Sequence, residues 1–89
     1  MAKPKVGQIV FLPVEVKPGM FSSELKFRGD IMGVPISGFA QKDQIAGKTL
    51  TASIIQVGKH NATIVLSGEV SQQKVFSVPL GFVRQHTQK

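Results

Sequence analysis

Apolar and polar residues alternate most regularly between residues 50 and 83. Two segments, 50–57 and 62–66, have apolar side chains at nearly every second position, and the stretch from Gly58 to Asn61 between them has the composition of a turn. A polar loop at residues 67–73 leads to a third such segment, which ends at Val78-Pro79-Leu80-Gly81-Phe82. The pattern predicts a three-stranded β-meander closed by a Pro-Leu-Gly-Phe corner.

The alternation slips by one residue within the first of these strands. Ile54 shares the parity of Leu50 and Ala52, whereas Ile55 and Val57 have the opposite parity. A slip of one residue moves a side chain to the other face of a sheet, so we expect a β-bulge or burial on both faces near Ile54.

The chain before residue 20 also has the pattern of a strand. Residues 8–16 contain the apolar run from Ile9 to Leu12, followed by alternation of Val14 and Val16 with charged residues. Pro13 interrupts the segment and predicts a bend, a bulge or an edge position, because proline cannot donate a ladder hydrogen bond. Lys17-Pro18-Gly19 predicts a turn.

Residues 21–28 alternate strictly between apolar or small and charged or polar side chains. This alternation places Lys26 and Arg28 together on the solvent face of a strand. We expect a turn at Gly29–Asp30 and strand again from residue 31 to residue 40, where several glycines and prolines favour a strongly bent sheet.

One segment has helical character. Residues 41–46 fit a single helical turn, and Gly47 can end it in the left-handed conformation. The chain is therefore predicted to be mainly β: a small barrel or sandwich of about six to seven short antiparallel strands with one short helical turn near residues 41–46.

The length of 89 residues predicts a single domain. Val34-Pro35-Ile36-Ser37-Gly38-Phe39 resembles Val78-Pro79-Leu80-Gly81-Phe82 when one residue is skipped. This match favours either a two-fold repeat with halves 1–47 and 48–89, in which both Gly-Phe pairs lie at equivalent corners, or two uses of a common β-corner. Residues 1–5 and 85–89 are predicted to be loose.

Composition narrows the class of protein. The absence of cysteine excludes disulfides, thiolate metal sites and a cysteine nucleophile, and it favours an intracellular, cytoplasmic protein. No apolar run is long enough to cross a membrane, so no membrane partner is expected. Eleven Lys and Arg against five Asp and Glu give a net charge of +6, which makes nucleic acid a candidate partner.

No residue set predicts catalysis or a cofactor. The five acids are scattered, His60 and His86 have no metal-ligating residues at suitable spacing, and Gly47-Lys48-Thr49 lacks the first glycine of a phosphate-binding loop. We therefore expect a protein that is not an enzyme and has no catalytic residues, metal or small-molecule cofactor.

Two binding functions remain. The first is a basic β-domain that contacts nucleic-acid phosphates; its six phenylalanines fall mostly at core or corner positions, so phosphate contact is favoured over base stacking. The alternative is a protein-interaction or homo-oligomerisation module, because several strands carry apolar residues on both faces. The phosphate-binding residues expected for the first function are Lys26, Arg28, Lys42, Lys59 and Arg84.

Overall fold

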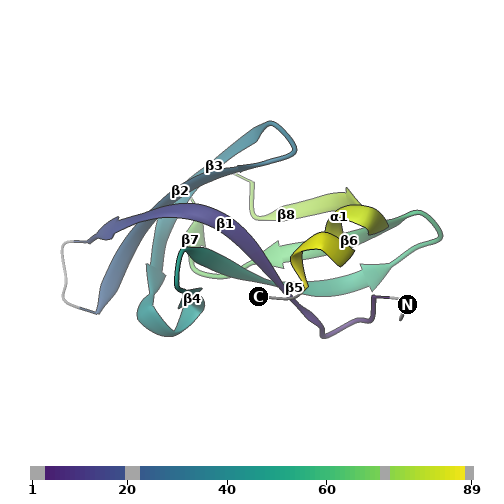
Figure 1. Ribbon diagram of the computed structural model, residues 1–89, viewed down its shortest axis with the longest axis horizontal. Helices are drawn as coiled ribbons and strands as arrows, with labels where there is room; N and C mark the ends of the chain where they lie inside the picture. Colours follow the sequence, from purple (N-terminus) through teal and green to yellow (C-terminus); the bar gives the residue numbers. More distant parts are fainter. Residues whose placement is uncertain (1–3, 20–22, 71–72, 88–89) are drawn as a thin grey trace.

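A computed structural model describes residues 4–19, 23–70 and 73–87 of the chain. It is mainly β, with one 3-10 turn and one α-helix, as the sequence predicts (Figure 1). The elements in the described part of the chain are β1 (Ile9–Pro18), β2 (Glu24–Ile31), β3 (Val34–Gln41), η1 (Lys42–Gln44), β4 (Ile45–Ala46), β5 (Thr49–Val57), β6 (Asn61–Leu66), β7 (Glu69–Val70), β8 (Val75–Pro79) and α1 (Leu80–His86).

Seven of the strands form one antiparallel sheet in the order β7-β3-β2-β1-β5-β6-β8, and β4 pairs with β5 beside this path. The sheet curls into a half-barrel, and the molecule is about 41 Å long along its longest axis. The predicted meander is confirmed, because β5, β6 and β8 are successive antiparallel neighbours. The predicted bulge is confirmed as well: the register of β5 against β6 shifts between Ile54 and Gln56, and Ile55 at the shift is half exposed.

Strand β1 joins the two parts of this sheet. Residues Ile9 to Pro13 pair with β5, and residues Val14 to Pro18 pair with β2. Pro13 thus lies where one partner strand is exchanged for the other, and the sequence-based expectation of a bend there agrees with this position. We divide the strands into two groups. Sheet A consists of β4, β5, β6, β8 and the first part of β1, and sheet B consists of β2, β3, β7 and the second part of β1.

Alternate residues of every long strand point into a single core. The fully buried side chains include Phe27 of β2, Leu12 of β1 and Ile64 of β6, so both sheets contribute to it. Helix α1 closes the core over sheet A, because Val83 is fully buried and Leu80 and Phe82 pack against the cluster. No charged or polar side chain is buried among the described residues.

The α-helix is the main element that the sequence did not predict. Residues 80–86 were assigned to a corner and a loose tail, yet Leu80–His86 is helical, with Pro79 as its N-cap residue. Seven residues are too few for a helical period to be visible, and such a short helix depends on tertiary packing rather than on propensity. Pro4 is buried and Gln85 and His86 lie in α1, whereas residues 1–3 and 88–89 lie outside the described residues. The looseness expected at both ends stays a prediction.

Two turn predictions need correction. Gly29 and Asp30 do not form a turn but continue β2, and the chain reverses at Met32 and Gly33. Both turn residues have positive φ, 51° and 87°, which is the type I′ geometry that matches the twist of a two-residue hairpin. The predicted helical turn is shorter than residues 41–46, since η1 ends at Gln44 and Gly47 lies in the β4–β5 turn instead.

The two Gly-Phe pairs are not equivalent corners. Gly38 and Phe39 lie within β3, whereas Gly81 and Phe82 lie within α1. The expectation of matching corners is therefore wrong, and duplication of the two halves stays a prediction.

Gly38 sits under the backbone of β7. A Cβ atom placed on Gly38 would collide with the carbonyl oxygen of Glu69 and reach the Cα atom of Val70 at 3.0 Å. We expect Gly38→Ala to lower the free energy of unfolding by about 1–3 kcal/mol, because overpacking against rigid backbone forces the strands apart. Gly81→Ala is the matched control: no atom lies within 4 Å of its Cβ position, and alanine suits a helix better than glycine. Urea denaturation measures both, and equal unfolding midpoints for the two variants would contradict this account of β7.

Candidate nucleic-acid interface

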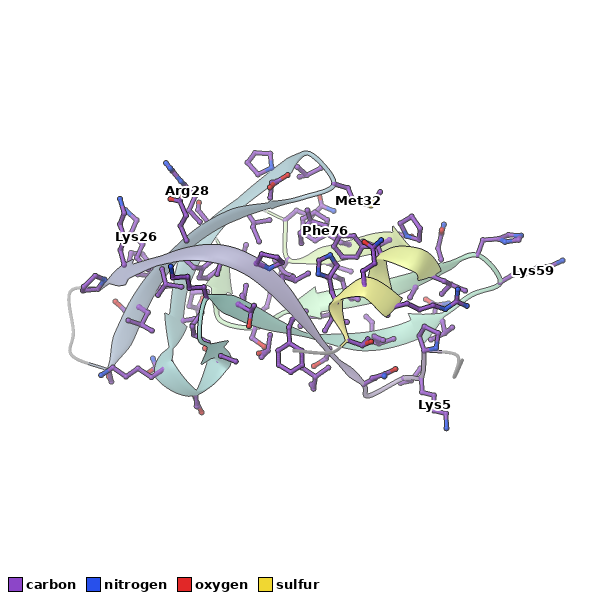
Figure 2. The ribbon with its side chains drawn as sticks, viewed as in Figure 1. Lys5, Lys26, Arg28, Met32, Lys59 and Phe76 are labelled. Atoms are coloured by element: carbon purple, nitrogen blue, oxygen red, sulfur yellow. The ribbon has the colours of Figure 1, made fainter. Side chains whose placement is uncertain are left out.

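The five expected phosphate-binding residues do not form one patch. Lys26 and Arg28 lie on β2 and Lys42 begins η1, whereas Lys59 lies at the turn between β5 and β6 and Arg84 lies on α1. Figure 2 shows Lys26 and Arg28 side by side near one end of the long axis and Lys59 at the other end. The structure therefore separates the expected residues into a group beside sheet B and a group beside sheet A.

On sheet B, alternation along the strands brings Lys26 and Arg28 to the outer face, as predicted. Lys17 of β1 is the direct cross-strand partner of Lys26, and Glu15 is the partner of Arg28. Arg28 Nη2 lies 3.4 Å from Glu15 Oε2, and both side chains are more than two-thirds exposed. A depression of about 100 Å³ lies among these residues, lined by Glu15, Lys17, Lys26, Phe27 and Arg28.

Acidic side chains offset the basic ones on this half of the molecule. Sheet B, η1 and the described residues beside them (14–19, 23–44 and 67–70) carry four Lys or Arg and all five Asp and Glu of the chain. Asp30 follows Arg28 along the outer side of β2, and Asp43 is the neighbour of Lys42 in η1. The sheet-B half therefore has a formal charge of −1, and its basic side chains are interspersed with acidic ones.

The opposite holds for the rest of the chain. It carries seven Lys or Arg and no Asp or Glu, a formal charge of +7, which together with the −1 of the sheet-B half gives the net charge of +6. We call residues 4–13, 45–66 and 75–87 the acid-free half; Lys74 is not part of it, because it lines a depression together with Glu24 and Glu69. Its exposed cations include Lys5 before β1, Lys48 before β5, Lys59 after β5 and Arg84 on α1. Figure 2 shows Lys5 and Lys59 at the same end of the molecule.

The outer face of sheet A has a second property. Its outward positions carry no charged side chain, and one cross-strand row runs Ile9–Ser53–Val65–Val75 over four strands. Ile9 is 40% exposed and Val75 is 46% exposed. We call this surface the uncharged face; its outward residues are Ile9, Phe11, Thr49, Thr51, Ser53, Ile55, Gln56, Asn61, Thr63, Val65, Val75, Ser77 and Pro79.

Hydroxyl groups on this face are engaged at one end. Thr51 Oγ1 donates to the Gln44 carbonyl oxygen at 3.2 Å and lies 3.0 Å from Ser67 Oγ. The segment after β6 is thereby tied to β5, and Ser67 N also donates to the Thr51 carbonyl oxygen at 3.1 Å. These contacts fix one border of the uncharged face. In the row Ile9–Ser53–Val65–Val75, the two end residues are exposed and the two middle residues are half-buried.

The phenylalanines divide more evenly than the sequence predicts. Phe27 and Phe76 are buried and Phe82 packs against the core, where its ring lies 4.4 Å from that of His86. Phe39, however, is 37% exposed on sheet B as the partner of Lys26, and Phe11 is half-buried on the uncharged face. Phe21 lies outside the described residues. Phe39 lies between the buried residues Gly38 and Ala40 of β3, so alternation places it on the outer face. It was missed because Gly38-Phe39 was expected to form a corner.

Within the described residues, no group of three or more His, Asp or Glu side chains is placed to hold a metal ion. None of the described helices has the length and hydrophobicity that crossing a bilayer requires.

The opposed Lys17 and Lys26 provide a test of the sheet-B geometry. Like charges directly across an antiparallel pair destabilise it, so Lys17→Glu should raise the free energy of unfolding by about 0.2–1 kcal/mol. Lys59→Glu, at a turn without a cross-strand partner charge, controls for the change in net charge. Thermal unfolding at low salt measures both. An equal shift in unfolding temperature for the two variants would mean that the net charge, and not the Lys17–Lys26 pair, determines the effect. The stability gained by Lys17→Glu should decrease at high salt, because salt screens the repulsion.

Comparison of the chain with models of protein families, with curated proteins and with solved structures finds no match.

Proposed function

We propose that this protein is a small basic binding module whose acid-free half contacts the phosphates of nucleic acid. The observation that carries the proposal is the separation of charge: the acid-free half carries four Lys or Arg and no Asp or Glu among its described residues, while sheet B and η1 combine four Lys or Arg with five acids. A polyanion is attracted by an uncompensated positive surface and gains little from lysines interleaved with acids. The contacting residues in this proposal are Lys5, Lys48, Lys59 and Arg84.

Two of these four, Lys59 and Arg84, belong to the set expected from the sequence. Lys26, Arg28 and Lys42 are left out because Glu15, Asp30 and Asp43 lie beside them. An exposed ion pair such as Arg28–Glu15 contributes little to stability, but its carboxylate still repels an approaching phosphate.

Two charge-matched variants test this proposal. The first changes Lys5, Lys48, Lys59 and Arg84 to Gln; the second changes Lys17, Lys26, Arg28 and Lys42 to Gln. Each removes four positive charges, so any effect of net charge alone is equal in both. We expect the first variant to lose oligonucleotide affinity and to reduce the slope of log K against log salt by up to about 3, and the second to stay close to the wild type.

Fluorescence anisotropy with a labelled oligonucleotide, from about 50 to 200 mM salt, measures both quantities. Absence of binding by the wild type at the lowest salt would overturn the proposal. Equal losses in the two variants would also overturn it, because attraction would then follow total charge and not the acid-free half. Urea unfolding of each variant establishes that the fold is retained.

Self-association is the second candidate function, and the uncharged face is the observation that favours it. A sheet face that carries no charge and exposes apolar side chains such as Ile9 and Val75 suits an interface, and pairing of two copies would add stability to a small domain. Sedimentation at high micromolar concentration tests this: a concentration-dependent dimer supports self-association, and a monomer throughout contradicts it.

A further inference from the structure

The lysines of the acid-free half border the uncharged face. Lys48 directly precedes β5, Lys59 follows its far end by two residues, and Lys5 lies four residues before the start of β1. Gly7 N donates to the Ile54 carbonyl oxygen at 2.8 Å, which ties the segment after Lys5 to the edge of β5. Cations therefore stand at both ends of the strands whose outward residues carry no charge.

We propose that the uncharged face binds single-stranded nucleic acid, with bases against the row Ile9–Ser53–Val65–Val75 and phosphates toward the bordering lysines. This inference rests on the proposed function and specifies the class of nucleic acid. A single strand has two kinds of surface, unstacked bases and a charged backbone, and it needs an apolar or hydroxyl-bearing surface flanked by cations. Ser53 and Thr63, in the middle of the face, add hydroxyl groups that can donate to base edges or accept from them.

Charge decides between this occupant and a second copy of the chain. Packing two uncharged faces together brings two acid-free halves against each other, and each of them carries four Lys or Arg and no Asp or Glu among the described residues. Such an interface concentrates positive charge, which opposes association most at low salt. A polyanion over the same face neutralises that charge, so electrostatics favours the nucleic acid.

Charge and shape also favour a single strand over a duplex. In a duplex the bases are stacked inside, and a phosphate backbone laid on an uncharged sheet would place its charges against Ile9, Val65 and Val75 rather than against lysine. Single-stranded bases can instead cover these partly exposed side chains and withdraw them from water.

A pair of neutral double variants tests the role of the face. Ile9→Ser with Val75→Ser removes two exposed apolar side chains from the uncharged face, and Met32→Ser with Val34→Ser removes two exposed apolar side chains from the β2–β3 hairpin. Neither changes the charge. The probe is a labelled single strand about 12 nucleotides long, within the site sizes of small β-barrel domains, together with a duplex of the same length.

We expect the wild type to bind the single strand more tightly than the duplex. The Ile9→Ser, Val75→Ser variant should lose about 5- to 150-fold in single-strand affinity with an unchanged salt slope, while the hairpin variant keeps the wild-type affinity. Because Ile9 and Val75 are both partly exposed, circular dichroism and urea unfolding should show that the fold survives, and Val65→Thr provides a milder change at the middle of the same row.

The contrary results are distinct. If the wild type binds neither probe, both the proposed function and this inference fail. If it binds both probes equally and the Ile9→Ser, Val75→Ser variant behaves as the wild type, phosphate contact stands and the inference about single strands is overturned. Sedimentation provides a third outcome. If the wild type is a dimer, and the Ile9→Ser, Val75→Ser variant is a monomer with unchanged single-strand affinity, the face is a contact between copies and the inference is overturned.

Discussion

The bend of β1 at Pro13 is the constraint on which the rest of this structure depends. A single strand supplies pairing partners to β5 and then to β2, so both sheets share one backbone and one core. Proline suits the position at which β1 changes from one partner strand to the other, because it has no backbone N–H group that needs a hydrogen-bond acceptor there. On the other side, Gly29 lets the backbone of β2 approach, since a Cβ there would lie 3.0 Å from the Pro13 carbonyl oxygen. A bend of this kind turns a flat sheet into a half-barrel.

Two unlike outer surfaces follow from that bend. Because β1 leaves sheet A at Pro13, the charged residues Glu15 and Lys17 fall on sheet B, while Ile9 and Phe11 fall on sheet A. The same separation holds along the other strands: β2 carries outward charges, and β5, β6 and β8 carry none. The division of charge in the chain thus becomes a division in space, and the proposed function and the single-strand inference both depend on it.

The strands of this protein were largely predictable, and the elements held by tertiary packing were not. The alternation of apolar and polar residues over 50–66 predicted two strands, and the slip at Ile54 predicted the bulge. Both are visible in the sequence because successive side chains of a strand point to opposite faces of the sheet. The type I′ turn at Met32–Gly33 was missed because methionine is an unusual residue at positive φ, and Gly29–Asp30 offered a stronger turn composition. Helix α1 was missed because its seven residues form a helix only when Val83 and Leu80 pack into the core.

The sequence by itself determined the fold class, the outward positions of Lys26 and Arg28, the net charge and the absence of thiol chemistry, since these depend on composition and on local periodicity. Tertiary structure decided which charges are neighbours. Lys26 and Arg28 are close to each other but also to carboxylates, and they lie at the opposite end from Lys59. Strand order and the bend at Pro13 determine how far these charged side chains lie from one another. The alternation within a single strand predicts neither of them, because strand pairing joins residues that are far apart in the chain.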